Sequence, residues 1–176
     1  MLLFNKNCNN VLTNIFNLCI IKEGLEMPDC IVKVKKLREN SKMLFKATPE
    51  SACYDVYACL DGLESVTICP NQSVKIGIGL AFKIEPGWCG LVYARSGMAS
   101  KYKLSPSNSV GVIDSDYTGE VIVDLFNEGM VTRTVHNGDR IAQIMFVPVH
   151  NVEFMEVDEL DDTIRGTGGF GSTGTR

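Results

Sequence analysis

The stretch VKIGIGLAFKI, residues 74–84, alternates large apolar side chains with lysine, glycine or alanine along its whole length. In an extended chain a period of two puts every second side chain on one face, so this segment predicts a half-buried β-strand. The same alternation recurs in residues 121–126 and 151–157, and residues 140–149 are a near-continuous apolar run ended by Pro148. Between such segments stand turn-forming pairs, namely Asp61-Gly62, Pro70-Asn71, Pro86-Gly87 and Asn137-Gly138. Many short strands at this spacing predict an all-β fold, a jelly-roll-like β-barrel, in which only residues 95–103 have helical character.

The composition is that of a single globular domain. The chain has 176 residues, of which 45% are hydrophobic, and this length can bury a sizeable core. The formal net charge of −4 argues against a nucleic-acid partner or an anionic membrane, and it leaves a local site for a small anion open. Seven cysteines without a Cys-x-x-Cys pair predict reduced thiols and a cytoplasmic protein. Two histidines do not favour a zinc site.

Residues 1–30 differ from the rest of the chain. Asparagines interrupt a hydrophobic stretch over residues 11–21, which is too short and too polar to span a bilayer. The codons for Lys22-Glu23-Gly24 can form a purine run that resembles a bacterial ribosome-binding site upstream of Met27, so we predict that translation starts at Met27. The alternative is a frayed or partner-binding N-terminal extension. The β domain is predicted over residues 31–160.

Residues 161–176 form a C-terminal arm, in which the run RGTGGFGSTG, residues 165–174, holds five glycines. Such a run loses too much backbone entropy on folding to be ordered alone, and a flexible terminus is one interpretation. The other is a phosphate-binding loop, since glycines let backbone N–H groups approach an anion. Arg165 and Phe170 favour the loop, because they offer one charge for a phosphate and one flat face for a base.

Five blocks stand in a fixed order over residues 31–173: SACYDVYA (51–58), RSGMA (95–99), GVIDSDYTGE (111–120), GDRIAQ (138–143) and the glycine-rich arm. Together they resemble the homotrimeric dUTPases. The resemblance implies a jelly-roll protomer and shared active sites, each taking the second and fourth blocks from one chain, the third from a neighbour and the arm from the remaining chain. It also implies hydrolysis of dUTP to dUMP and pyrophosphate, with Mg²⁺ held mainly by the triphosphate and no metal ligand from the protein. Such an enzyme limits uracil incorporation into DNA and supplies dUMP for dTMP synthesis.

Asp114 matches the family's catalytic aspartate in the third block, which orients and deprotonates the attacking water. From the residues alone, Asp114 is equally a turn aspartate whose side chain caps backbone donors. For Asp55, in the first block, the resemblance implies support of the site rather than chemistry.

Phosphate binding is expected at the start of the helical segment, where free N–H groups and the helix dipole favour an anion. The resemblance places Ser96 and Gly97 on the phosphate chain, and the alternative for Ser96 is a helix N-cap. Arg95 either binds phosphate or forms an ion pair that holds Asp55 or the framework of the site. For Gln143, in the fourth block, the resemblance implies a contact with phosphate and ordered water. The alternative is a polar residue on a solvent face. In the arm, the resemblance implies three further phosphate contacts, Arg165, Ser172 and Thr173.

Recognition of the base and sugar is implied for a third set of residues. Tyr117 resembles the tyrosine whose ring packs under the deoxyribose and leaves no room for a 2′-hydroxyl; its alternative is a core aromatic. Asn108 is expected to bond the uracil edge, and its alternative is a turn residue in SPSNS, residues 105–109. Phe170 is expected to stack on the uracil face. Backbone closure around the base, which rejects the thymine methyl, is assigned to Gly111, Val112 and Ile113.

Cys53 departs from the family pattern, because it stands where the family usually has glycine, and a positive φ there would strain it. Two alternatives to a dUTPase stay open. One is a dCTP deaminase of the same fold, whose chemistry requires a glutamate beside the base and which lacks the phenylalanine-bearing arm. The other is a non-catalytic, nucleotide-binding regulatory trimer.

Overall fold

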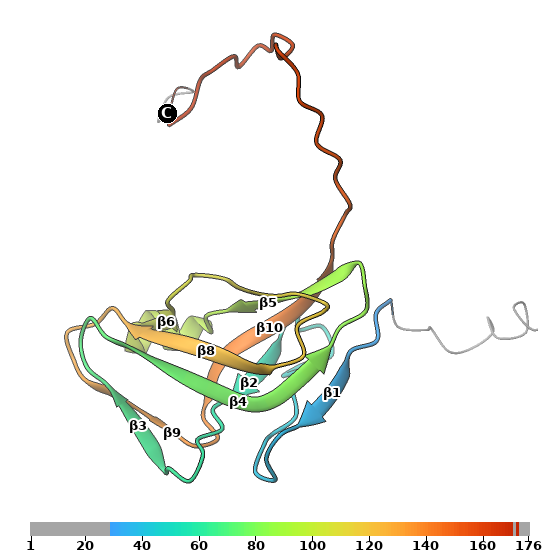
Figure 1. Ribbon diagram of the computed structural model, residues 1–176. Helices are drawn as coiled ribbons and strands as arrows, with labels where there is room; N and C mark the ends of the chain where they lie inside the picture. The colour runs from blue at the N-terminus through green and yellow to red at the C-terminus, as the bar shows by residue number, and fades with distance from the viewer. Residues whose placement is uncertain (1–28, 171, 173–176) are drawn as a thin grey trace, which may run out of the picture.

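The computed structural model describes residues 29–170 and 172, and their regular structure is almost entirely β (Figure 1). One π-helical turn, η1 (Met98–Tyr102), lies between the fifth and sixth strands. The strands are, in chain order, β1 (Lys33–Lys36), β2 (Tyr54–Tyr57), β3 (Ser65–Ile68), β4 (Ser73–Lys83), β5 (Trp88–Tyr93), β6 (Leu104–Pro106), β7 (Gly111–Ile113), β8 (Glu120–Asn127), β9 (Arg133–His136) and β10 (Arg140–Pro148). No helix in these residues has the length and apolar character needed to cross a membrane. The predicted start at Met27 and the arm residue Thr173 lie outside the described residues.

Two four-stranded antiparallel sheets carry the fold. One has the strand order β1-β4-β8-β6, the other has the order β2-β10-β5-β7, and β3 pairs separately with β9. Figure 1 shows β4 and β8 in front of β5 and β10, so the two larger sheets face each other. Buried side chains from both sheets form one apolar cluster between them.

The alternation in residues 74–84 decides which face of β4 enters this core. Ile76, Ile78, Leu80 and Phe82 are each at most 2% exposed, whereas Lys75 lies on the solvent side. Burial of one such apolar side chain contributes about 1.5–3 kcal/mol, before the entropy of ordering is subtracted. The segment that predicts the fold class is therefore also the longest strand of the core.

The all-β prediction with one short helix is confirmed, and η1 falls inside the predicted helical segment. Within the described residues the hydrogen-bonded sheets do not close into a barrel. The prediction of a strand over residues 151–157 is wrong, because this stretch pairs with no other strand of the described chain, and Phe154 and Met155 are 93% and 82% exposed. A period of two selects the side-chain face, but a strand also needs a partner for its backbone groups.

A bulge interrupts β4 opposite the start of β8. The register between the two strands shifts between Gly77 and Ala81, and Gly79 takes a φ of +70°. A Cβ on Gly79 would overlap the Ser41 hydroxyl and lie 2.7 Å from the Cys59 sulfur. Only glycine satisfies both the backbone angle and the close approach, so the bulge presses β4 against the segment that follows β1.

Substitution of Gly79 by alanine tests this packing, with Gly62→Ala as the control. Both glycines have a φ of +70°, but nothing lies within 4 Å of a Cβ on Gly62. We expect Gly62→Ala to lower the free energy of unfolding by about 1 kcal/mol from backbone strain, and Gly79→Ala by about 3 kcal/mol because steric overlap is added. Urea denaturation measures both losses, and equal losses would contradict the close packing at Gly79.

Candidate functional site

Asp55, in β2, holds two arginines. Its Oδ1 accepts a hydrogen bond from Arg95 Nε at 2.7 Å, and its Oδ2 accepts one from Arg140 Nη1 at 3.0 Å. Asp55 is only 8% exposed, so the two cations compensate a carboxylate that is largely removed from water. Arg95 Nη1 also donates to the Arg140 carbonyl at 3.2 Å. The ion pair suggested for Arg95 is therefore present, and these three residues, the Asp55 cluster, tie β2 to β10 and to the segment after β5.

Gln143 lies beside the Asp55 cluster in β10. It pairs with Asp55 of β2 on one side and with Tyr93 of β5 on the other. Its Nε2 donates to the Ala94 carbonyl at 3.0 Å, and the residue is half-buried, so it does not lie on a solvent face. The first, second and fourth sequence blocks thus meet around one part of this sheet.

The turn after Arg95 leads into η1. The Ala99 N–H donates to the Arg95 carbonyl at 3.0 Å, and Gly97 occupies the N-cap position without a side-chain cap bond. Ser96 is exposed and is not the helix N-cap, so that alternative is wrong. Its hydroxyl stands instead at the start of a helical turn, where backbone dipoles favour an anion.

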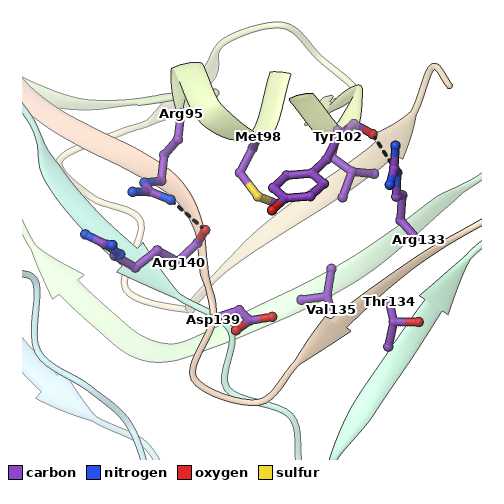
Figure 2. A pocket seen from close by; sticks show the side chains of 9 residues that line it. Arg95, Met98, Tyr102, Arg133, Thr134, Val135, Asp139 and Arg140 are labelled. Carbon is purple, nitrogen blue, oxygen red and sulfur yellow. Dashed lines mark hydrogen bonds between the residues drawn. The ribbon is translucent and has the colours of Figure 1, made fainter. Parts of the chain in front are cut away.

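A cavity of about 360 Å³ opens between η1 and the connection from β9 to β10 (Figure 2). Figure 2 shows side chains of Arg95, Arg133 and Arg140 around it. Arg133 Nε donates to the Tyr102 carbonyl at 3.1 Å, and its guanidinium lies 5.4 Å from the centre of the Tyr102 ring. The cavity is cationic, but its lining does not include the other expected phosphate contacts of this region, Ser96, Gly97 and Gln143.

Asp114 follows β7 and begins the loop that leads to β8. A hydrogen bond from the Tyr117 N–H to the Asp114 carbonyl, at 3.2 Å, closes the turn, and the Asp114 side chain is exposed. The Tyr117 hydroxyl donates to the Glu120 carbonyl at 2.8 Å, while the residue stays 44% exposed. Tyr117 is therefore not a core aromatic, and that alternative is wrong.

A second cavity, of about 330 Å³, lies beside this loop. Asn108 and β7 (Gly111–Ile113) are part of its lining. A Cβ on Gly111 would make ordinary van der Waals contact with Asn108 Nδ2 at 3.5 Å, so the two residues are neighbours in this cavity. The Ser109 N–H donates to the Pro106 carbonyl at 3.0 Å, so Asn108 is a turn residue as well. Asn108 and the three residues of β7 thus share one cavity, whereas Tyr117 and Phe170, also expected to recognise the base and sugar, are not in its lining.

The pairing of β5 with β7 keeps the Asp55 cluster and Gln143 apart from the loop that carries Asp114 and Tyr117. In the antiparallel register, Ile113 at the end of β7 pairs with Gly90 near the start of β5. Asp114 therefore lies near the start of β5, whereas Arg95 follows its far end. The extended chain from Gly90 to Arg95 covers roughly 15 Å. One chain does not bring both groups against the same phosphate.

The arm leads away from the sheets after β10 (Figure 1). Its apolar side chains Ile164 and Phe170 are fully exposed. Arg165 Nε donates within the arm, to the Gly168 carbonyl at 3.1 Å. In the described chain, therefore, neither the Asp55 cluster nor the Asp114 loop is reached by the arm residues expected in the site, Arg165, Phe170 and Ser172.

Sequence reasoning missed Arg140 and Arg133. Arg140 stands in the fourth block, and its proximity to Asp55 follows from the pairing of β2 with β10, in which Arg140 is opposite Tyr57. Only the charge of Arg140 inside a block was visible in the sequence. Arg133 lies outside the blocks and gave no signal.

Cys53 is accommodated without strain. Its φ is not positive, so Cys53 does not adopt the left-handed conformation that would strain a residue replacing glycine. Burial, followed by the nearby Asp55 charge, raises the pKa of its thiol. As for metal ligands, the described residues contain no group of three or more His, Cys, Asp or Glu side chains that could hold an ion.

Comparison with known proteins gives one consistent result. The sequence model of the dUTPase family matches residues 39–174. A deoxyuridine 5′-triphosphate nucleotidohydrolase of Desulfitobacterium hafniense (strain DSM 10664 / DCB-2) is 49% identical over 146 residues, which cover 81% of this chain and 95% of that protein. The enzyme of the same name from Maricaulis maris (strain MCS10) is 42% identical, with 82% and 97% covered.

Solved structures agree with the sequence relatives. A mutant of the Staphylococcus bacteriophage 80alpha dUTPase with dUpNHpp superposes with a TM-score of 0.74 at 26% identity, over 82% of this chain and 99% of that one. A mutant dUTPase from phage phi11 of S. aureus, described as revealing the coordination of a structural Mg(II) ion, gives a TM-score of 0.67 at 25% identity, over 75% and 99% of the two chains.

Asp55→Asn tests the Asp55 cluster, because it keeps the shape of the side chain and removes its charge. We expect the free energy of unfolding to fall by about 2–4 kcal/mol, since two arginines lose their shared counter-charge. The control is Asp61→Asn, whose carboxylate is 88% exposed and 4.0 Å from Arg38 Nε; it should change stability by less than about 0.5 kcal/mol. Urea denaturation at neutral pH measures both, and similar midpoints for the two variants would contradict the role given to Asp55.

Proposed function

The chain belongs to the dUTPase family, and on that basis we propose how its residues hydrolyse dUTP to dUMP and pyrophosphate. The observation that carries the proposal is the separation of the site residues into three groups. These are the Asp55 cluster with Gln143, the loop that carries Asp114 and Tyr117, and the exposed arm. In a homotrimer, each active site receives one group from each chain.

Asp114 is the general base. Its carboxylate is exposed at the end of β7, where a water molecule can reach it. The carboxylate orients the water and takes its proton while the water oxygen attacks the α-phosphorus. The bridge between the α- and β-phosphates breaks, and the electron pair leaves with pyrophosphate.

The phosphate chain lies against the turn that follows β5. Arg95 is oriented by Asp55 through Nε, and its Nη2 takes part in neither the Asp55 bond nor the bond to Arg140. Ser96 and Gly97 add donors at the start of the helical turn, and Gln143 completes the set from β10. These groups are mainly N–H and O–H donors, which suit phosphate oxygens rather than a cation. Mg²⁺ would therefore be held by the triphosphate, where it neutralises charge.

The base occupies the cavity beside β7. The Asn108 amide meets the uracil edge, and the backbone of Gly111, Val112 and Ile113 closes around position 5 of the ring. The hydroxyl of Tyr117 is bound to the Glu120 carbonyl, so its exposed ring face is presented to the deoxyribose. A 2′-hydroxyl finds no space there, which excludes ribonucleotides.

The arm closes the site of a neighbouring chain. Arg165 meets the terminal phosphate, Phe170 stacks on the uracil, and the glycine-rich backbone with Ser172 and Thr173 adds donors. The exposure of Ile164 and Phe170 supports this proposal, because a contact with a second chain would remove these apolar groups from water.

The cellular role that follows is removal of dUTP, which limits uracil incorporation into DNA and supplies dUMP for dTMP synthesis. The proposed compartment is the cytoplasm. In the described part of the chain the cysteines are free thiols, as a reducing compartment maintains them: Cys30, Cys53, Cys59, Cys69 and Cys89.

Asp114→Asn tests the chemical step, with Asp116→Asn, an exposed aspartate of the same loop, as its control. We expect Asp114→Asn to lower kcat for dUTP by about a thousandfold and Asp116→Asn to change it by less than about threefold. The assay measures pyrophosphate released from dUTP, dCTP, dTTP and UTP, with Mg²⁺ and then with EDTA, and release should be selective for dUTP and lost in EDTA. Ammonia released from dCTP would indicate a deaminase, and dUTP binding without release of pyrophosphate would indicate a regulatory trimer.

Deletion of residues 165–176 tests the arm. Turnover of dUTP should fall by about a hundredfold, because the site loses its closing segment, while the thermal midpoint and the trimer seen by light scattering should be unchanged. Phe170→Trp, which keeps a stacking face, should retain most activity, whereas Phe170→Ala should not. Coincident loss of thermal stability and of the trimer on deletion would contradict the assignment.

A further inference from the structure

Glu120 begins β8 and ends the loop that carries Asp114 and Tyr117. Its carboxylate forms a two-bonded ion pair with Arg38, with an Nη1–Oε1 distance of 2.6 Å and an Nη2–Oε2 distance of 2.8 Å. The Arg38 and Glu120 side chains are 26% and 20% exposed, so water screens the pair only in part. A bidentate pair of this kind fixes orientation as well as distance. Arg38 lies before the first of the five blocks and just outside the region matched by the family model.

The same carboxylate holds the bulge of β4. Glu120 Oε1 accepts a hydrogen bond from the Gly79 N–H at 2.8 Å. A Cβ on Gly77 would overlap Oε1, so that glycine provides the space that the carboxylate occupies. The hydrogen bonds from Arg38, more than any other influence, hold the pKa of Glu120 below its usual range, and the group is charged at neutral pH. Glu120 is thereby fixed from two directions.

The backbone of Glu120 is the anchor of Tyr117. The Glu120 carbonyl accepts the hydrogen bond of the Tyr117 hydroxyl at 2.8 Å. Between the two residues, a Cβ on Gly119 would lie 2.7 Å from that hydroxyl and 2.8 Å from the ring carbon that bears it. The ring is therefore folded back over Gly119, and its place depends on where the Glu120 backbone is held.

We propose that Arg38 is a positioning residue for Tyr117 and acts through Glu120 to set how strongly the enzyme rejects a 2′-hydroxyl. The inference rests on the proposed function, in which the Tyr117 ring packs under the sugar. Without Arg38 the Glu120 carboxylate keeps only its bond from the Gly79 N–H, and the Glu120 carbonyl is held less firmly. The Tyr117 ring then moves away from the sugar, and the 2′-hydroxyl of a ribonucleoside triphosphate fits in its place.

Arg38→Met removes the guanidinium and keeps an unbranched apolar side chain. We expect the ratio of kcat/KM for dUTP to kcat/KM for UTP to fall by about tenfold, because the sugar contact loosens while the base and phosphate contacts stay. Arg38→Lys keeps the positive charge but cannot form the two-bonded pair with Glu120, so it should give an intermediate ratio. Asp61→Asn is the matched control: it removes the other carboxylate near Arg38, at 4.0 Å, and should leave the ratio unchanged.

A role in folding alone would lower kcat/KM for both nucleotides equally and leave the ratio as in the wild type, which would overturn the proposal. Coupling to Tyr117 is tested by Tyr117→Phe, which loses the hydroxyl and keeps the ring. Tyr117→Phe should lower the ratio, and Arg38→Met should lower it no further in the Tyr117→Phe background. Independent, multiplying effects of the two substitutions would also overturn the proposal.

The position of the ring is measured without turnover by the NMR ring signals of Tyr117, assigned by their loss in Tyr117→Phe. They should shift in Arg38→Met and not in Asp61→Asn. Unshifted signals would overturn the positioning role whatever the enzyme does. A wild-type protein that hydrolyses no dUTP, with signals that do shift in Arg38→Met, would instead overturn the proposed function and leave the positioning of the ring established.

Discussion

The antiparallel register between β5 and β7 is the constraint on which the account of this protein depends. It places Asp114 beside the start of β5 and Arg95 beyond its end. Strands are stiff, and the ladder that joins these two cannot slip by one residue without turning every side chain to the other face. The separation is therefore built into the sheet, and in the proposed mechanism the two groups of one chain serve two different active sites. The exposed arm after β10 carries the third group of proposed site residues, and in the proposed homotrimer each site joins one group from each of three chains.

Each of the first two parts is oriented by a shielded carboxylate. At one end, Asp55 fixes Arg95 and Arg140, which come from segments distant in sequence. At the other end, Glu120 fixes the close of the loop that carries Asp114 and Tyr117, through Arg38 and the β4 bulge. In the Asp55 cluster the charge-assisted hydrogen bond reaches Arg95 directly, whereas the bond from Arg38 holds Glu120, whose backbone carbonyl accepts the Tyr117 hydroxyl. Arg95 and Tyr117 are the residues that touch substrate in the proposed mechanism. Positioning is thus separated from chemistry, since Asp114, the proposed base, is itself exposed.

Sequence patterns predict the local features of this structure, namely single strands and turns. The alternation in residues 74–84 predicts β4, and Asn71, Gly62, Gly87 and Gly138 all take the positive φ expected of their turns. Contacts between distant segments carry no such pattern. The register of β2 with β10 brings Arg140 to Asp55, and the bulge in β4 brings Glu120 to Gly79.

The prediction of a strand over residues 151–157 failed for the same reason. Alternation defines a face, but the backbone partner that makes a strand has to come from elsewhere, and the described chain offers none. For the candidate site, the residue types were accessible from the five blocks. The resemblance implied their division into three groups, and the sheet register adds a physical reason for it, because it separates Asp114 from Arg95.

The division of the site between chains is tested most directly by mixing two inactive proteins. One is Asp114→Asn, which keeps its arm, and the other lacks residues 165–176 and keeps Asp114. After the two are unfolded together and refolded at equal concentration, each mixed trimer should contain one site with an intact Asp114 and an intact arm from different chains. Random assembly then restores about a quarter of the wild-type rate of dUTP hydrolysis. A mixture no more active than the separate variants would show that each chain completes its own site, and would contradict the account.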